Sequence, residues 1–326
     1  MKCINKLFKT FTAILLASCL TACVSTGSAL RMPFSDFANS SETKDFSESD
    51  AVLSGFASGL AVLEGDVTDY YELENAPAGL LVDLNNNEII FAENAFEERF
   101  PASITKIMTA YVALKYCDPS ETITCTENVS TIDVYGAVLM GLKKGDTLTL
   151  DQALHLALLA SYNDVAVAIA EHVSGSVEAF AELMNEEAKL LGATHSNFEN
   201  PHGLTGDNHY TTAYDLYLIF NAAIQNQTIL EIIQCKEYAT VYYDKNGKEL
   251  SAYAQNTNRY FMGTYTIPET VTLVGGKTGT TDEAGYCLMM LVRDKYSNPY
   301  IAVILGSDSR DHLYNEMTEL LSRLNN

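Results

Sequence analysis

The stretch that decides the fold reads Pro101-Ala102-Ser103-Ile104-Thr105-Lys106-Ile107-Met108-Thr109-Ala110-Tyr111-Val112-Ala113-Leu114. It contains no glycine and no second proline, and residues 107–114 are mostly apolar, which predicts a buried helix that begins near Pro101. Ser103 then lies in the first turn of this helix. Because side chains three residues apart share a helix face, the Ser103 hydroxyl and the Lys106 amine are expected to be neighbours.

The Ser103-x-x-Lys106 pair predicts an activated serine nucleophile. A serine hydroxyl is a poor nucleophile unless a base removes its proton, and a lysine can be that base only in its neutral form. Burial and a second cation both lower a lysine pKa, so another positive group is expected in the same cleft. The pattern alone is weak, because Ser41-x-x-Lys44 repeats it in an acidic stretch with no core to hold a helix.

Two further motifs follow along the chain. Ser161-Tyr162-Asn163 lies at a break between two predicted helices, and Lys277-Thr278-Gly279-Thr280 ends a predicted strand. Taken singly, they are consistent with helix caps and with a strand-to-turn exit. Taken together and in this order, the three motifs match the set found in active-site serine β-lactamases and penicillin-binding proteins, although Tyr162 stands where aspartate is usual.

The order of predicted elements indicates an α+β fold. A hairpin is expected first, helices follow in the middle of the chain, and strands return near its end. The expected helix caps are Asp151, Asn163 or Asp164, and Ser176. The expected helices cover residues 152–160, 165–173, 177–191, 212–223 and 312–324, and the expected strands cover residues 79–83, 88–92, 238–243, 271–275, 286–292 and 300–305. One antiparallel sheet built from both chain ends, flanked by helices and with an inserted helical subdomain, accounts for this order.

The first residues predict export. Three lysines precede an apolar run that is too short to span a bilayer, so residues 1–22 are interpreted as a signal peptide. Leu20-Thr21-Ala22-Cys23 resembles a lipobox, which predicts a lipid on Cys23 and a protein held at the extracytoplasmic face of the membrane. Cys19 is an alternative lipid site, and ordinary cleavage with secretion is another alternative. Residues 23–75 are expected to be an acidic flexible tether, and residues 76–326 the catalytic domain.

Composition excludes several classes of partner. The formal charge is −22, and removal of residues 1–22, which hold three lysines and no acid, makes it −25. So acidic a protein is not expected to bind nucleic acid or anionic lipid. Neither a cofactor nor a metal is expected, because the six histidines show no metal-ligand spacing with acids or cysteines. Nothing in the sequence indicates an oligomeric state.

Four cysteines lie in the expected domain, and none forms a C-x-x-C pair. They are Cys117, Cys125, Cys235 and Cys287. Scattered cysteines are more often buried small apolar residues, which is the favoured interpretation. A Cys117–Cys125 disulfide across a turn is the alternative for an exported protein.

From about Pro77 onward the chain resembles the D-alanyl-D-alanine carboxypeptidase family of low-molecular-mass penicillin-binding proteins. The resemblance rests on the three motifs and on three longer segments. These segments are Phe100 to Thr109, Asn200-Pro201-His202-Gly203-Leu204 with His209 to Leu216, and Lys277 to Tyr286. It implies a β-lactamase/penicillin-binding-like fold and removal of the terminal D-alanine from peptidoglycan stem pentapeptides through a Ser103 acyl-enzyme. Penicillins and other β-lactams would then be covalent inhibitors.

The resemblance also implies a role for each motif residue. Ser103 would be the nucleophile, Lys106 the general base and Ser161 a proton relay. Asn163, Lys277, Thr278, Gly279 and Thr280 would bind substrate, and the backbone amides of Ser103 and Thr280 would form the oxyanion hole. Arg259 resembles an arginine that helps to bind the terminal carboxylate in some members, whereas His202 is interpreted as structural. Many members carry a second β domain and a C-terminal membrane anchor, and neither is expected after Gly279.

Two other functions remain open. A class A β-lactamase would need a glutamate that activates water, and Glu199 is near the usual place, but it is followed by the carboxypeptidase pattern that starts at Asn200. A β-lactam sensor or cell-wall-binding lipoprotein could keep the same fold without turnover. Release of D-alanine separates an enzyme from a sensor.

Overall fold

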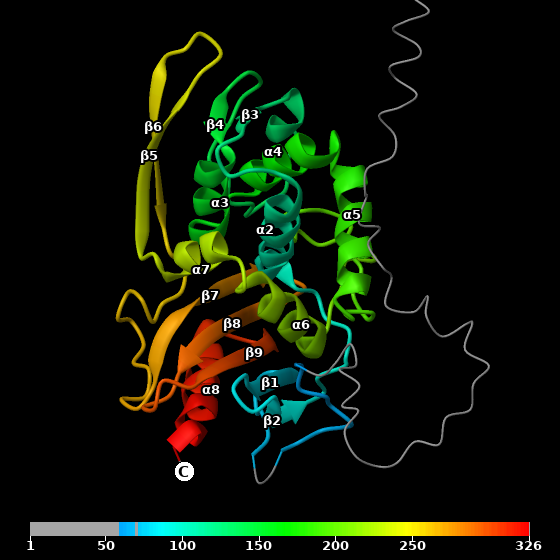
Figure 1. Cartoon of the computed structure of the whole chain (residues 1–326), viewed down its shortest axis with the longest axis vertical. Helices are drawn as coiled ribbons and strands as arrows, with labels where there is room; N and C mark the ends of the chain where they lie inside the picture. The colour runs from blue at the N-terminus through cyan, green and yellow to red at the C-terminus, as the bar shows by residue number, and fades with distance from the viewer. Residues whose placement is uncertain (1–58, 69–70, 326) are drawn as a thin grey trace, which may run out of the picture. The chain divides into compact units, whose positions relative to one another are not determined.

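A five-stranded antiparallel sheet forms the centre of the computed structural model, which describes residues 59–68 and 71–325 (Figure 1). The strand order is β2-β1-β9-β8-β7. The strands are β1 (Ala78–Asp83), β2 (Glu88–Glu93), β7 (Thr272–Thr281), β8 (Gly285–Arg293) and β9 (Pro299–Ser307). Leu80 of β1 lies opposite Val303 of β9, so the sheet joins both ends of the domain, which confirms the expected α+β architecture.

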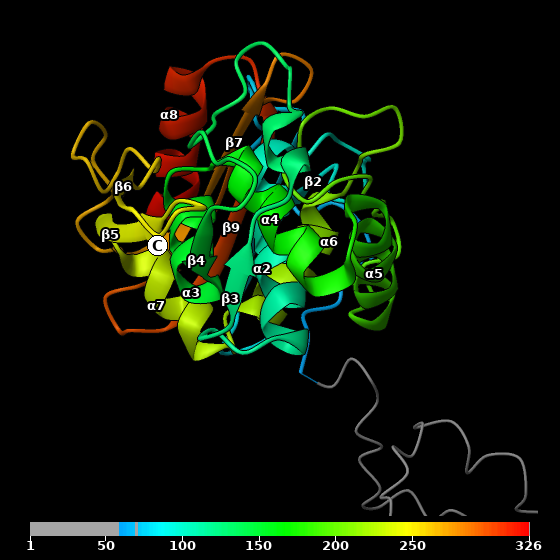
Figure 2. The ribbon, with the colours of Figure 1, turned by 90° about the horizontal axis from the view of Figure 1, so that it is seen from above.

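The two faces of the sheet bury two separate apolar cores. Alternate residues of a strand point to opposite faces, and Met289 of β8 packs in one core while Met290 packs in the other. The core around Met290 is closed by α8 (Arg310–Ser322), which continues as η4 (Arg323–Asn325). The core around Met289 is closed by the helical subdomain, and α8 and α6 (Ala213–Ala223) lie on opposite sides of the sheet (Figure 2).

The inserted helical subdomain is present as expected. Its central helix α2 is mostly buried up to its last turn and packs against α3, α4, α5 and α6. The helices are η2 (Ala102–Ile104), α2 (Thr105–Tyr116), η3 (Glu127–Ser130), α3 (Leu150–Leu159), α4 (Asn163–Ser174), α5 (Val177–Leu190), α6 (Ala213–Ala223) and α7 (Gln227–Gln234). The short helix α7 was not expected from the sequence.

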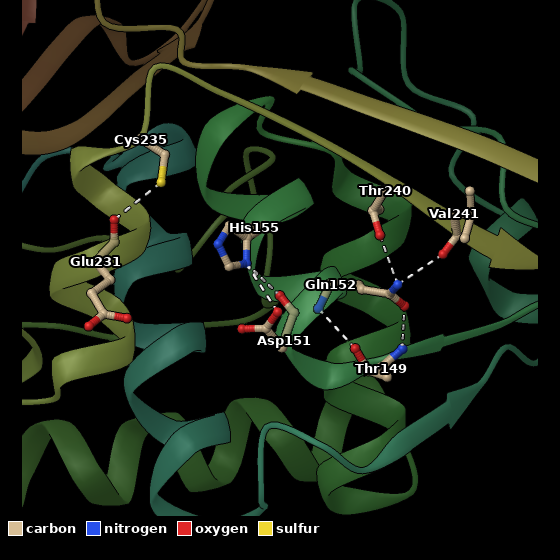
Figure 3. A network of polar contacts seen from close by, with 8 residues as sticks. All are labelled: Thr149, Asp151, Gln152, His155, Glu231, Cys235, Thr240 and Val241. Atoms are coloured by element: carbon tan, nitrogen blue, oxygen red, sulfur yellow. Dashed lines mark hydrogen bonds and ion pairs between the residues drawn. The ribbon is translucent and has the colours of Figure 1, made fainter.

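The cap of α3 differs from the one expected. Thr149, and not Asp151, is the N-cap: its hydroxyl accepts the N–H of Gln152 at 3.2 Å, and the Gln152 amide oxygen accepts the Thr149 N–H at 2.8 Å (Figure 3). This reciprocal capping box satisfies two helix-end donors at once, which a cap at Asp151 would not do. The prediction of a Ser176 cap on α5 is confirmed, since its hydroxyl accepts the Ala179 N–H at 3.1 Å.

The N-cap of α4 was also predicted wrongly. Tyr162 occupies the cap position without a side-chain cap bond, and Asn163 is already the first helical residue. The Asp164 carboxylate instead accepts the backbone N–H groups of Met140, Gly141 and Leu142 at 2.9, 2.7 and 3.0 Å. A distant loop therefore binds the side chain that the local pattern assigned to the helix end.

A second antiparallel sheet has the order β3-β4-β5-β6. It consists of β3 (Thr122–Thr124), β4 (Thr147–Thr149), β5 (Glu237–Tyr243) and β6 (Glu249–Gln255). The sequence placed residues 238–243 in the main sheet, which is wrong. Tyr243 pairs with Thr147 of β4, a contact across nearly a hundred residues that no local pattern contains. The β5–β6 hairpin projects away from the main sheet (Figure 1).

Residues upstream of the expected boundary at residue 76 already contact the domain. The Ala61 N–H donates to the Tyr217 hydroxyl at 2.9 Å, the Tyr214 hydroxyl donates to the Ala61 carbonyl at 2.8 Å, and Leu63 is buried.

The predicted signal peptide, Cys19 and Cys23 lie outside the described residues. Within the described ranges, no helix combines the length and the apolar character that a membrane span needs.

The four cysteines of the domain are free thiols, so the alternative of a Cys117–Cys125 disulfide is wrong. Cys125 and Cys287 are buried, in line with the interpretation of cysteines as small apolar residues. Cys117 and Cys235 are only half-buried.

Candidate active site

Lys106 is the centre of the candidate site. Its Nζ atom lies 3.0 Å from Ser103 Oγ, 2.7 Å from Asn163 Oδ1 and 2.7 Å from the His202 carbonyl oxygen. Ser103 lies in the short η2 helix that leads into α2, as the sequence predicted, and Asn163 starts α4. Three distant segments therefore meet at one amine.

The surroundings of Lys106 favour its neutral form. The side chain is almost fully buried, and burial, followed by the charge of Lys277, holds its pKa well below the ordinary lysine value, although Asp164 opposes this. A neutral amine has two N–H donors and one lone pair. The Asn163 and His202 oxygens can only accept, so they take the two N–H groups, and the lone pair is left to accept the Ser103 proton.

Lys277 is the second buried cation that the pKa argument required. Its Nζ atom donates to Ser161 Oγ at 3.1 Å and to the Thr278 carbonyl at 3.0 Å. Burial lowers the Lys277 pKa to about 7. The Lys277 contact therefore links the Ser161 motif to the motif on β7. The Lys106 contacts link the Ser103 motif to Asn163 of the Ser161 motif.

Backbone geometry turns the Ser161 segment toward the site. Ser161 has a φ of 66°, in the left-handed region that costs a non-glycine residue roughly 1–3 kcal/mol. The next residues are held in place, because the Asn163 N–H donates to the Val138 carbonyl at 2.8 Å and the Tyr162 hydroxyl donates to the Tyr253 carbonyl at 3.0 Å. The strained turn therefore presents the Ser161 hydroxyl and the Asn163 amide to the same site.

Two glycines allow the site to close. A Cβ atom on Gly279 would lie 2.8 Å from the Pro101 carbonyl oxygen and 3.0 Å from the Ser103 nitrogen. Gly203 has a φ of 87°, and a Cβ there would lie 1.8 Å from the Ala102 carbonyl oxygen. Strand β7 and the loop that carries His202 therefore both approach the Ser103 backbone at distances that only glycine permits.

The two histidine rings of this loop make hydrogen bonds within the loop and to Thr105. The His202 ring accepts the Leu204 N–H at 3.1 Å, so only its carbonyl contacts Lys106. His209 accepts the Glu199 N–H at Nδ1 and lies 2.9 Å from the Thr105 hydroxyl at Nε2. Burial, with a further effect of the Lys106 charge, lowers the pKa of His202 to about 3 and that of His209 to about 4. Both rings are therefore neutral at physiological pH.

A cleft of about 310 Å³ opens over the serine. Ser103, Ser161, Thr278, Gly279 and Thr280 line it, as does Arg259. The sequence-based prediction missed Arg310, which also lines the cleft and whose guanidinium carbon lies 5.5 Å from the Tyr286 ring centre. Arg310 belongs to no recognised motif, and only the packing of α8 on the sheet brings it here.

Comparisons with known proteins concern the family and the fold. Residues 70–309 match the family model described as D-alanyl-D-alanine carboxypeptidase, peptidase S11. The chain is 30% identical to the D-alanyl-D-alanine carboxypeptidase DacF of Bacillus subtilis, over 76% of this chain and 61% of that protein. It is 32% identical to DacC of Escherichia coli, over 76% of this chain and 60% of that protein. The chain thus spans about three fifths of the length of these relatives.

A solved structure gives the same fold. The Streptomyces K15 DD-transpeptidase superimposes with a TM-score of 0.70 at 26% identity, over 76% of this chain and 96% of that one. The family match covers most of the chain and includes every residue of the three motifs. This chain therefore belongs to the D-alanyl-D-alanine carboxypeptidase family, peptidase S11.

Proposed function

We propose that this protein is a serine-type D-Ala-D-Ala carboxypeptidase that removes the terminal D-alanine from peptidoglycan stem pentapeptides. The observation that carries the proposal is the 3.0 Å contact between Lys106 Nζ and Ser103 Oγ, in surroundings that favour a neutral amine. A neutral base in hydrogen-bond reach of a serine is the arrangement that nucleophilic catalysis requires. Family membership supports the choice of substrate.

Residues of all three motifs take part in the reaction. Lys106 accepts the Ser103 proton while Oγ attacks the carbonyl carbon of the penultimate D-alanine. The Ser103 and Thr280 backbone N–H groups stabilise the oxyanion, whose charge appears only in the transition state. The C–N bond then breaks, and the leaving amine of the terminal D-alanine receives a proton through Ser161. Water attacks the resulting ester, which frees Ser103 and the shortened peptide.

Positive groups on one side of the cleft would bind the terminal carboxylate. Lys277 bonds to Ser161 and Thr278, which line the cleft, and the Arg259 and Arg310 side chains line it directly. Thr278 and Thr280 lie on β7, the last strand in the order of the main sheet, whose free edge suits an extended peptide. A β-lactam, with its own carboxylate and reactive carbonyl, would use the same groups and acylate Ser103.

The position of Glu199 supports a carboxypeptidase over a class A β-lactamase. Its carboxylate accepts the Asn208 N–H at 3.1 Å, within its own loop. Its backbone N–H donates to His209, which is another contact of the same loop. A β-lactamase glutamate would instead have to hold a water against the serine ester.

For the cellular location, we propose export and anchoring through a lipid on Cys23. The support is the lipobox-like Leu20 to Cys23 and the basic and apolar residues before it. A single lipid chain binds membranes only marginally, so a fully acylated lipoprotein end would be needed for stable anchoring. The long acidic segment that follows Cys23 would let the domain reach the cell wall.

The test is mass spectrometry of a D-alanine-terminated pentapeptide incubated with the purified protein, with parallel labelling by a fluorescent penicillin. We expect loss of one D-alanine per peptide, and no reaction or labelling with Ser103→Ala. Ser41→Ala is the matched control, because Ser41 belongs to the second Ser-x-x-Lys sequence and should leave both signals intact. Penicillin labelling without release of D-alanine would contradict the proposed carboxypeptidase activity and indicate a β-lactam sensor.

A further inference from the structure

Three side chains with metal-binding atoms meet at the C-terminal end of α2, whereas Ser103 lies just before its N-terminal end. They are Cys117, Glu121 and His172, whose Sγ, carboxylate oxygen and ring nitrogen all lie within 4.8 Å of one another. Among the described residues, this is the one group of three or more His, Cys, Asp or Glu side chains that meets this criterion. The sequence did not predict it, because His172 is far from the other two residues along the chain.

The donor set selects the metal by its chemistry. Zinc is bound by thiolate, imidazole and carboxylate at about 2.0–2.3 Å, which places ligand atoms of a tetrahedral site roughly 3.3–3.8 Å apart. His172 Nε2 and Glu121 Oε2 are 3.1 Å apart, close to that spacing, and small side-chain rotations bring Sγ into range. Calcium and magnesium need several oxygen ligands, and this site offers one carboxylate.

The ligands are held by the surrounding backbone. The Glu121 N–H donates to the Asp118 carbonyl, and Glu121 Oε1 accepts the Asp118 N–H at 2.7 Å, so Oε2 is left to face His172. Cys117 ends α2, and its N–H donates to the Ala113 carbonyl at 2.9 Å. A carboxylate fixed by a second hydrogen bond is a feature of metal sites, where outer contacts orient the ligand.

The helix ends add a favourable electric field. Cys117 is the C-cap of α2, and His172 lies in the last turn of α4. The C-terminal end of a helix carries a partial negative charge from its unpaired carbonyls, and each end favours a cation. Two such ends meet here, next to the Glu121 carboxylate.

We propose that Cys117, Glu121 and His172 form a zinc site that ties the C-terminal end of α2 to the C-terminal end of α4. Coordination releases the thiol proton to solvent, and water completes the fourth position, because Glu121 is exposed. The N-terminal ends of the same helices bring Lys106 to Asn163. The two helices thus run side by side in one direction, with the catalytic contact at one end and the zinc at the other.

The first experiment measures binding of zinc alone to the untagged, chelator-treated protein by equilibrium dialysis and elemental analysis. We expect Cys117→Ser and His172→Gln to lose one equivalent of zinc. The loss of affinity should exceed the roughly 10–100-fold that follows removal of an outer hydrogen-bond partner. Cobalt should give a near-ultraviolet thiolate-to-metal band that Cys117→Ser abolishes.

Two matched controls come from α3 and from the C-cap of α7. Cys235 is also half-buried, but its thiol bonds to the Glu231 carbonyl, and His155 also has an acidic neighbour, Asp151 (Figure 3). Cys235→Ser and His155→Gln should bind zinc like the unchanged protein. Equal zinc loss in these controls, or full zinc binding by Cys117→Ser, would overturn the proposal.

Thermal melting and penicillin labelling then separate this site from the catalytic one. Zinc at a hundredfold excess over its dissociation constant should raise the melting temperature by about 5 °C, and Cys117→Ser should abolish the rise. Zinc-free protein and Cys117→Ser should still be labelled by penicillin, because no ligand of this site contacts Ser103 or Lys106. A melting temperature that does not respond to bound zinc would refute the tie between α2 and α4.

Discussion

Lys277 Nζ and Ser161 Oγ are 3.1 Å apart, although the residues are far apart in the chain and lie on different parts of the fold. The contact joins β7 of the main sheet to the turn before α4 of the helical subdomain. Lys106 makes the complementary contact by joining Ser103 to Asn163. The candidate active site therefore lies at the junction of sheet and subdomain, and its geometry depends on their packing.

The first prediction concerns the base. Lys106→Arg should reduce penicillin acylation by about 10²–10⁴-fold, because a guanidinium cannot give up a proton to become a base. The acylation rate constant, measured with a fluorescent penicillin, checks this. Lys115→Arg, at the far end of the same helix, is the control and should be acylated at the normal rate. A normal rate in Lys106→Arg would remove Lys106 from the mechanism.

The pH dependence of acylation should be bell-shaped. Below the lowered pKa of Lys106 the amine is protonated and cannot take the Ser103 proton, so the rate falls as pH falls. Above the Lys277 pKa of about 7 the positive charge that attracts the carboxylate is lost, so the rate falls as pH rises. The second-order rate constant for acylation reports the ionisation of groups in the free enzyme, and it should decline on the alkaline side from near pH 7. A Lys277→Arg variant should lose that alkaline decline, and its persistence would assign the decline to another group.

Arg259 and Arg310 should govern affinity for the terminal carboxylate. Replacing either by alanine removes a charge-assisted hydrogen bond of about 1.5–3 kcal/mol, which should lower kcat/KM for the pentapeptide roughly 10–150-fold. Steady-state release of D-alanine measures this. Arg293→Ala is the control, since Arg293 donates to the Ser297 carbonyl in a turn and does not line the cleft. Equal losses with an amidated peptide would show that these arginines do not bind the carboxylate.

Gly279→Ala should damage the site by crowding. The new Cβ would meet the Pro101 carbonyl at 2.8 Å and the Ser103 nitrogen at 3.0 Å, and overpacking of this kind costs about 1–3 kcal/mol. We expect a lower melting temperature and a loss of penicillin labelling greater than the loss of folded protein. Gly65→Ala, which has nothing within 4 Å of its added Cβ, should change neither. Wild-type labelling in Gly279→Ala would show that β7 does not need this close approach.

Cys23→Ala should release the protein from membranes. If the lipid is on Cys23, the variant should move from the membrane fraction to the soluble fraction, and mass spectrometry should no longer find a lipid-modified N-terminal cysteine. Cys19→Ala is the control and should stay membrane-bound. Release by Cys19→Ala alone would move the lipid site to Cys19.

Much of the fold could be predicted from local patterns. An apolar periodicity or a turn signal within one short segment was enough to predict three features. These are the hairpin at residues 79–92, the buried helix after Pro101 and the strands near residues 286–305. The motif residues Ser103, Lys106, Ser161, Asn163 and Lys277 were found in the same way, and the structure brings all five together.

Other features depended on contacts that no short segment contains. Asp164 turned from the helix end to three amides of a distant loop, whereas the Thr149 cap of α3 belongs to a local Thr-x-x-Gln pattern that the prediction overlooked. Arg310 entered the cleft only because α8 packs on the sheet. Such partners meet through burial of apolar surface, which is not directional, so a periodic pattern shows which face of an element is buried and not which element it meets.

By itself, the sequence determined the class of fold and predicted which hydroxyl and amine carry the chemistry, because these follow from periodicity and from residue types at short spacing. Only the tertiary structure decided that Lys106 is buried near Lys277, which favours its neutral form, and that Cys117 meets His172. The meeting of Cys117 and His172 follows from the side-by-side packing of α2 and α4, and both relationships join residues that are close in space and distant in the chain.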